Sequence, residues 1–344
     1  MKIGILEGNG IGPEIVAATK AVLEATGLPL EWVIIPSPDE ALSKYGHPLP
    51  PEVVAMLRDV KYTIKGPMEV LKTKGRVTCT LEDGTQETYP SINNAFRRRL
   101  KLYASPRMAK SVPGFSKFDN VDMVIFRELT EGVYIGWENV LPGVFAQAIN
   151  LCTKAAVERL THLAFKYAKE NGRKKITCVH KANAVSITDG LFLTTFREVA
   201  KQYPEIQSDD YMVDATAFYM VTKPQMFDVI VTGNQYGDIL SDLAGGIAGS
   251  LGLAPGGNQN DEIFIAEASH GSAPDIAGKG IANPVALLLS GAMMLEFAGK
   301  QAEAKRIQAA TYAVLAEGKT RTPDMGGKSS TKELTDAIIA KMKA

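Results

Sequence analysis

The sequence has little that would mark a secreted, metal-finger or repeat protein. Its 344 residues contain only three cysteines, Cys79, Cys152 and Cys178, which are widely spaced and form no Cys-x-x-Cys pair. An odd number of scattered cysteines indicates neither a disulfide framework nor a zinc site, and is typical of isolated thiols in a reducing compartment. The chain also lacks any internal repeat or low-complexity segment.

Charge of one sign and long apolar runs are missing as well. Basic and acidic residues number 38 each, so no imbalance favours binding to nucleic acid or to a membrane surface. The longest apolar stretch, around residues 285–295, is too short to span a bilayer. Met1 leads directly into a strand-like run, which leaves no room for a signal or transit peptide. We therefore expect a soluble cytoplasmic protein, or one from an organelle matrix if a presequence has been removed.

What the chain does have is an alternation of strand and helix patterns, over a length that suits two domains. Short apolar runs near residues 2–6, 32–35 and 62–65 alternate with helical patterns, which predicts an α/β protein with parallel strands. The glycine-rich loop at residues 8–12 is similar to a dinucleotide fingerprint, but its third glycine is misplaced and Pro13 stands where the helix begins. A tight strand-to-helix turn explains this loop without a ligand. We prefer that interpretation, and leave open that the loop borders a cofactor.

Two aspartates four residues apart, Asp238 and Asp242, come just after the apolar run 227–231. On a helix this spacing directs both carboxylates to one face, where their repulsion is most simply relieved by a divalent cation such as Mg²⁺ or Mn²⁺. Two solvated acids on an exposed turn are the alternative. The position just past a strand end, where α/β proteins place ligand sites, favours the metal. Asp214 lies in an otherwise apolar helical run, and a buried acid there would need a partner such as a cation.

A second cluster of signals indicates an anion site. Ser91 is a good helix N-cap, and Asn93 and Arg97 share one face of the helix that follows. A helix N-terminus with such side chains suits a carboxylate, although a basic surface helix explains this segment equally well. Arg107 and Arg127, near predicted strand ends, add to the case for a small polyanionic substrate.

Three further features could take part in chemistry. Lys181 follows the apolar run 176–179, where a desolvated lysine could act as a general base, although a lysine that extends into water is the commoner case. Tyr134 lies in a glycine-flanked extended segment, where tyrosines usually pack. The loop 270–280 offers backbone N–H groups for phosphates, and its Asp275 could accept both hydroxyls of an adenosine ribose and repel a 2′-phosphate.

Together these motifs resemble the isocitrate/isopropylmalate dehydrogenase family, the metal-dependent β-decarboxylating dehydrogenases, over essentially the whole chain. The motifs that carry the resemblance are Gly8-Asn9-Gly10-Ile11-Gly12-Pro13-Glu14, Lys65-Gly66-Pro67, Ser91-Ile92-Asn93-x3-Arg97, Leu102-Tyr103-Ala104-x2-Arg107, Arg127-Glu128-x5-Tyr134, His180-Lys181-Ala182-Asn183, Asp214, Gly237-Asp238-Ile239-Leu240-Ser241-Asp242 and His270-Gly271-Ser272-Ala273-Pro274-Asp275-Ile276-Ala277-Gly278.

The resemblance implies a two-domain α/β fold with a mixed sheet and flanking helices, rather than a standard Rossmann domain. Residues 1–100 and 253–344 would form a large nucleotide-binding domain. Residues 101–252 would form a small domain, with an arm at about residues 132–150 that clasps a second subunit. The expected assembly is a homodimer with shared active sites, and a higher oligomer stays open.

The resemblance also assigns roles to single residues. The implied acid/base pair is Tyr134 and, from the partner subunit, Lys181, and the implied ligands of Mg²⁺ or Mn²⁺ are Asp238 and Asp242 with Asp214 of the other chain. The residues implied to bind the substrate are Ser91, Asn93, Arg97, Arg107, Arg127 and Asn183. The residues implied to bind NAD are His270, Gly271, Ser272, Ala273, Pro274, Asp275, Ile276 and Asn283.

The substrate follows from Ser91 and Asn93. Isocitrate enzymes are similar to this chain in carrying Ser-x-Asn, where the pair meets a carboxylate, whereas isopropylmalate enzymes place apolar residues there. A buried polar group left unpaired against an alkyl group costs roughly 1–3 kcal/mol. We therefore predict the oxidative decarboxylation of isocitrate to 2-oxoglutarate and CO₂, a step of the tricarboxylic acid cycle. We predict NAD as the cofactor because Asp275-Ile276 is similar to the NAD-preferring members of the family.

Other activities stay open. Homoisocitrate is longer than isocitrate by only one methylene, and 3-isopropylmalate is an alternative because the chain departs from the isocitrate enzymes at two segments. Residues 68–71, which include Glu69, replace a threonine-containing loop of the isocitrate enzymes, and residues 128–130 are closer to the isopropylmalate enzymes. A regulatory subunit of a hetero-oligomeric isocitrate dehydrogenase is a further alternative, although such subunits tend to lose the tyrosine, the lysine or a metal aspartate that this chain keeps.

Overall fold

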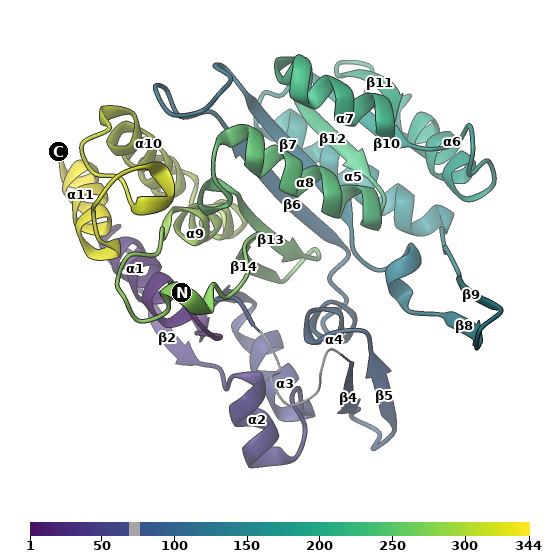
Figure 1. Ribbon diagram of the computed structural model, residues 1–344, viewed down its shortest axis with the longest axis horizontal. Helices are drawn as coiled ribbons and strands as arrows, with labels where there is room; N and C mark the ends of the chain where they lie inside the picture. The colour runs from purple at the N-terminus through teal and green to yellow at the C-terminus, as the bar shows by residue number, and fades with distance from the viewer. Residues whose placement is uncertain (69–75) are drawn as a thin grey trace.

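A computed structural model describes residues 1–68 and 76–344, and within them a ten-stranded mixed sheet with helices on both faces (Figure 1). Glu69, which belongs to the segment that departs from the isocitrate enzymes, lies outside the described residues. The order across the sheet is β11-β10-β12-β7-β6-β13-β14-β3-β1-β2. The strand bounds are β1 (Lys2–Leu6), β2 (Glu31–Ile34), β3 (Tyr62–Lys65), β6 (Ala104–Lys110), β7 (Asp122–Glu128), β10 (Lys175–His180), β11 (Gln207–Met212), β12 (Val229–Thr232), β13 (Pro255–Gln259) and β14 (Phe264–Ala268).

The sheet consists of two parallel halves that run in opposite directions. β11, β10, β12 and β7 are mutually parallel, and so are β14, β3, β1 and β2. Between them, β6 and β13 pair antiparallel with each other and with the adjoining strands β7 and β14. The expectation of parallel strands is thus right for the halves and wrong for the centre. β6 leads to β7, and β13 to β14, without a crossover helix, and only antiparallel neighbours can be joined in that way.

The register at the centre of the sheet places residues from four strands in one row. Arg107 on β6 is opposite Gly256 on β13, Gly256 is opposite Glu267 on β14, and Glu267 is opposite Lys65 on β3. Residues directly opposite each other in a sheet project to the same face. Arg127 on β7 pairs with Ser105, only two residues from Arg107. Charged side chains from distant parts of the sequence therefore lie above one face of the sheet.

The described residues contain eleven α-helices. Their bounds are α1 (Gly12–Glu24), α2 (Pro38–Tyr45), α3 (Pro51–Val60), α4 (Ile92–Arg99), α5 (Lys154–Glu170), α6 (Thr188–Ala200), α7 (Val213–Thr222), α8 (Asn234–Ala248), α9 (Val285–Phe297), α10 (Gln301–Glu317) and α11 (Thr331–Lys343). α8 packs against β6 and β7, and α5 packs behind β7 and β12 (Figure 1).

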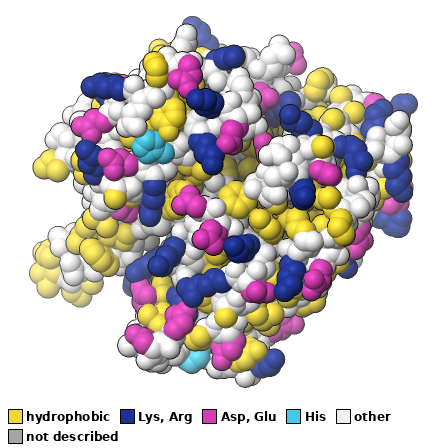
Figure 2. Space-filling view, turned by 180° about the vertical axis from the view of Figure 1, so that it is seen from behind, with side chains coloured by type: hydrophobic (Ala, Val, Ile, Leu, Met, Phe, Trp, Pro, Cys, Tyr) yellow, Lys and Arg dark blue, Asp and Glu magenta, His cyan; other side chains and the backbone are white. Residues whose placement is uncertain are grey.

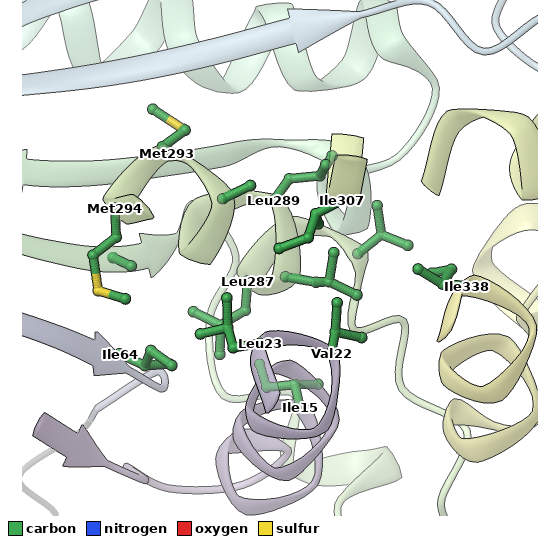
Figure 3. Packing of buried hydrophobic residues seen from close by; sticks show 14 of the residues in the cluster. Ile15, Val22, Leu23, Ile64, Leu287, Leu289, Met293, Met294, Ile307 and Ile338 are labelled. Carbon is green, nitrogen blue, oxygen red and sulfur yellow. The ribbon is translucent and has the colours of Figure 1, made fainter. Parts of the chain in front are cut away.

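The largest core cluster surrounds α9. This helix is apolar on all sides, because it lies between α1, α10 and the sheet. Leu287 lies next to Leu23, and Leu289 next to Ile307 (Figure 3). A helix without a polar face is expected either in a core or in a membrane, and here it lies in the core. Among the described helices, none combines the length and the apolar composition that crossing a bilayer requires.

Two hairpins lie outside the large sheet. β4 (Val77–Thr80) and β5 (Gln86–Tyr89) form a short antiparallel hairpin. β8 (Glu138–Leu141) and β9 (Phe145–Ala148) project from the body, and apolar side chains cover the projection, at lower left in Figure 2. All residues of both strands are exposed. An isolated hairpin is marginally stable in water, and an exposed apolar patch marks a contact surface, so this hairpin suits the predicted clasp arm. The clasp arm and the domain boundaries stay predictions.

The conformation around Tyr134 differs from the prediction. This residue lies in a 3₁₀ turn, Val133–Ile135, at the base of the projecting hairpin, and not in an extended segment. Gly132 and Gly136 on either side have φ values of 81° and 73°, which only glycine adopts freely, so the chain turns at both ends of this tripeptide. The turn directs the tyrosine toward α8.

Candidate active site

A cleft of about 240 Å³ opens above the central row of the sheet. It is lined by polar and charged side chains from six parts of the chain, among them Lys65, Asn93, Arg97, Arg107, Arg127, Asp238, Glu267, His270 and Ser272. The three arginines predicted to hold substrate carboxylates therefore converge. Their spacing along the chain could not show this, because they come from α4, β6 and β7.

α4 supplies one wall of the cleft. Ser91 caps this helix by accepting the N–H of Asn94 at 3.2 Å, so Asn93 and Arg97 are one turn apart on the face toward the cleft. The Oδ1 atom of Asn93 and the Nε atom of Arg97 are buried without a hydrogen-bond partner among the described residues. Burial lowers the pKa of the Arg97 guanidinium. Buried polar groups are normally satisfied, so this wall is shaped for a polar ligand.

Arg127 is held rigidly at the opposite wall. Its Nε and Nη2 atoms donate to Oδ1 of Asn234 at 3.0 and 2.8 Å, and its Nη1 atom pairs with Asp238. The Tyr134 ring centroid lies 5.7 Å from its guanidinium carbon. Burial, followed by the charge of Arg97, lowers the pKa of Arg127 to about 9, which leaves it cationic at neutral pH. Asn234 had no predicted role, although a polar residue directly after a buried strand is a signal for one.

The carboxylate pair lies beside Arg127. Asp238 and Asp242 are one turn apart on α8, which begins two residues after β12. The Tyr134 hydroxyl donates to Oδ2 of Asp238 at 3.1 Å. Partial burial, and next the charge of Asp238, raise the pKa of the Asp242 carboxyl. Two carboxylates one helical turn apart form a donor set that fits a hard divalent cation.

Lys181 and Asp214 lie elsewhere. They follow the paired strands β10 and β11, and the Lys181 ammonium group is 2.8 Å from Oδ1 of Asp214. This hydrogen bond lowers the pKa of Asp214. The Asp214 side chain is 64% exposed, so the expectation of a buried acid is wrong. α7 buries only Thr216 and Met220, and the remaining apolar side chains of its run stay near the surface.

Neither residue of this pair lines the cleft, and the exposed Asn183 does not line it either. Among the described residues, no group of three potential metal ligands comes together within the chain. The predicted trio of Asp214, Asp238 and Asp242 thus could form only between two copies.

The predicted nucleotide segment borders the cleft through His270, Gly271 and Ser272. Its continuation forms a 3₁₀ turn, Pro274–Ile276, that presents Asp275 to solvent. The Nε2 atom of His270 is buried without a partner among the described residues, and burial lowers its pKa, which keeps it neutral and available to a ligand. Asn283, the last residue of the predicted set, donates to Asp324 at 3.0 Å.

The first glycine-rich loop packs against this segment. The N–H of Ile11 donates to the Ser272 carbonyl at 2.9 Å, and a Cβ atom at Gly10 would lie 2.0 Å from that carbonyl oxygen. Close backbone packing therefore explains this glycine, as the preferred interpretation of the loop required. The loop borders the predicted cofactor segment without needing to bind it.

Comparison with known proteins identifies the family. The family model described as isocitrate/isopropylmalate dehydrogenase matches residues 2–338. The chain belongs to this family. An isocitrate/homoisocitrate dehydrogenase of Thermus thermophilus is 43% identical over 344 residues, which cover 100% of this chain and 99% of the relative. A 3-isopropylmalate dehydrogenase of Archaeoglobus fulgidus is 42% identical over 340 residues, 98% of each chain. The crystal structure of isocitrate dehydrogenase from Methylococcus capsulatus has a TM-score of 0.90 and 42% identity, and covers 100% of this chain and 99% of that one.

These isocitrate/isopropylmalate dehydrogenase matches confirm the predicted family and its mixed-sheet α/β fold. The chain is therefore an oxidatively decarboxylating dehydrogenase by family. Relatives named for different substrates are almost equally similar, so overall identity does not select one substrate.

Proposed function

We propose that the protein catalyses the NAD-dependent oxidative decarboxylation of isocitrate to 2-oxoglutarate and CO₂, with Mg²⁺ or Mn²⁺. The observation that carries this proposal is the meeting of Arg97, Arg107 and Arg127 with Asp238, one member of the carboxylate pair, in one cleft. Guanidinium groups match carboxylates in bidentate geometry, and paired carboxylates attract a hard cation. A small polycarboxylate that also binds a metal fits both halves of the cleft.

The polar wall of α4 supports isocitrate over an alkyl-substituted malate. Asn93 lines the cleft next to Arg97, and the N–H groups of its side-chain amide are donors that suit a third carboxylate. A site whose polar groups pair with the substrate strongly rejects a ligand that leaves those groups unpaired. An apolar pocket rejects a ligand that carries an added polar group much less strongly. Homoisocitrate, which also has three carboxylates, is the nearest alternative.

The metal would be held by Asp238 and Asp242, with Asp214 of a second copy, and would supply Lewis-acid stabilisation of negative charge on the substrate oxygen. NAD would be held by residues 270–276 and by Asn283, where Asp275 can accept the ribose hydroxyls and His270 offers its unpaired ring nitrogen. The chemistry of both donor sets fits these groups.

The proton transfers are assigned to two side chains. Lys181 of a second copy would accept the proton of the substrate C2 hydroxyl as C2 is oxidised, and bound NAD⁺ would supply the hydride acceptor. Tyr134 then protonates the carbon from which CO₂ has departed. Burial, and next the charge of Asp238, raise the pKa of Tyr134, so the phenol keeps its proton at neutral pH as an acid must. Its hydrogen bond to Asp238 orients it.

A steady-state panel tests the function. Isocitrate, homoisocitrate, 3-isopropylmalate and tartrate are each assayed with NAD⁺ or NADP⁺, with Mg²⁺ or with chelator. We expect the highest kcat/KM for isocitrate with NAD⁺, and loss of activity in chelator. A higher kcat/KM for isopropylmalate or homoisocitrate would contradict the substrate, and activity in chelator would contradict the metal. An inactive purified chain would favour a regulatory subunit.

Gly237→Ala should lower kcat/KM for isocitrate about 10²-fold, because displacement of a positioning side chain by about an ångström has effects of that size. A Cβ atom at this position would lie 2.6 Å from Cβ and Cγ of Arg127, so the arginine must move. Gly246→Ala on the same helix is the matched control, since its Cβ atom would have no neighbour within 4 Å. Equal kinetics for the two variants would show that the placement of Arg127 is not critical.

A further inference from the structure

The floor of the cleft holds an acidic side chain that the proposed reaction does not use. Glu267 is 9% exposed, and its Oε2 atom lies 2.5 Å from Nζ of Lys65, which is itself 5% exposed. Its Oε1 atom faces Nη2 of Arg107 at 3.4 Å and Nη2 of Arg97 at 3.9 Å. Burial acts to raise the pKa of Glu267, but Lys65, Arg107 and Arg97 outweigh it, and the pKa falls far below its usual range. The carboxylate is therefore ionised throughout the physiological range.

The backbone is arranged for this contact. Gly256 lies between Arg107 and Glu267 in the central row of the sheet, and a Cβ atom there would lie 2.6 Å from Cδ of Arg107. The missing side chain lets Arg107 cross the neighbouring strand toward Glu267. Lys65 reaches the same carboxylate from β3, directly opposite in the register. The cluster is thus a built feature of the sheet and not a surface ion pair, which would contribute little.

The charges in the cleft show what Glu267 changes. Lys65, Arg97, Arg107 and Arg127 carry positive charge, while Asp238 pairs with Arg127 and Glu267 faces the other three. The described cleft residues therefore have an excess of two positive charges. Without Glu267 the excess would be three, which equals the charge of a fully ionised tricarboxylate. The carboxylates of a bound substrate and Glu267 compete for the same cations.

We propose that Glu267 is an internal counter-ion of the cleft, a positioning residue that holds Lys65, Arg97 and Arg107 together in the absence of ligand. Because its charge opposes every anion in the cleft, it lowers the affinity for polycarboxylates in proportion to their charge. This role rests on the proposed function, in which a trianionic substrate is converted to a dianionic product. The counter-ion replaces the substrate as the partner of the arginines and so favours release.

The test compares two ligands that differ by one carboxylate and have no hydroxyl to oxidise. Tricarballylate has three carboxylates on a propane chain, and glutarate has two at the same ends. Titration calorimetry of the full chain at pH 8 with chelator gives the ratio of the glutarate Kd to the tricarballylate Kd. In Glu267→Gln we expect this ratio to rise about tenfold or more, because each ligand charge gains the same electrostatic increment in a poorly solvated site.

Two variants serve as controls. Glu267→Asp keeps the charge, so the ratio should stay within about twofold of the wild-type ratio. Lys65→Met/Glu267→Gln removes one charge of each sign, and the ratio should return toward the wild-type value although two cleft residues have changed. A role limited to packing would not produce this reversal.

A wild-type ratio in Glu267→Gln, with both ligands weakened alike, would overturn the counter-ion role. If that variant is unfolded in buffer, tricarballylate should restore its folding more than glutarate does, and equal restoration would overturn the role as well. A wild-type chain that binds neither ligand would contradict the proposed function itself. Normal binding by the wild type with an unchanged ratio in Glu267→Gln contradicts only the counter-ion.

Discussion

Replacing Lys181 by alanine should lower kcat for isocitrate oxidation about 10²–10⁴-fold, the range measured for the loss of a positioned general base. The melting temperature should change little, because the Lys181 side chain is 26% exposed and its ammonium group contacts only the exposed Asp214 among the ion pairs of the described residues. NADH formation at saturating isocitrate and a thermal unfolding curve measure the two effects. Normal oxidation of isocitrate by this variant would refute the assignment.

Tyr134→Phe is the matched comparison for that experiment. It removes the hydroxyl but keeps the ring next to the Arg127 guanidinium, and its kcat should fall by a similar factor. The two variants should differ in the first turnover. In the proposed mechanism, Lys181 acts as hydride leaves, whereas Tyr134 acts after CO₂ has departed. A rapid burst of NADH should therefore survive in Tyr134→Phe and be absent in Lys181→Ala. The same burst behaviour in both would remove the reason for two separate roles.

A dimer that contains one chain of each of these two variants should regain activity. A purified heterodimer of Lys181→Ala and Tyr134→Phe chains should have about half the wild-type kcat, because shared sites leave one of its two sites intact. The prediction follows from the separation of the Lys181–Asp214 pair from the Tyr134–Asp238 pair within one chain. Differently tagged chains, co-expressed and purified through both tags, provide the heterodimer.

The reciprocal heterodimer is the control. When a wild-type chain is paired with a Lys181→Ala/Tyr134→Phe chain, shared sites leave neither site intact, and this heterodimer should be inactive. If each chain used its own lysine and tyrosine, both outcomes would be reversed. The reversed pattern would contradict the shared site, even if both single variants were inactive as expected.

Parts of the cleft were predicted from local sequence signals. Ser91 as a helix cap, the shared face of Asn93 and Arg97, and the turn spacing of Asp238 and Asp242 all follow from helix geometry, and the structure has each of them. Glu267 was missed because a single acid near a strand end is a common surface feature. Only its burial beneath three cations marks it, and burial is not visible in a sequence.

By itself, the sequence determined which side chains share a helix face, where α4 begins, and which family the chain belongs to. Only the tertiary structure decided which of these pieces meet. It brought Lys65 to Glu267 across a separation of 202 residues, left Asp214 exposed beside Lys181, and kept that pair away from Asp238. The physical reason is that the period of a strand or helix sets the direction of a side chain, whereas its neighbours depend on strand order and register. Both of those arise from contacts between segments that are far apart in the chain.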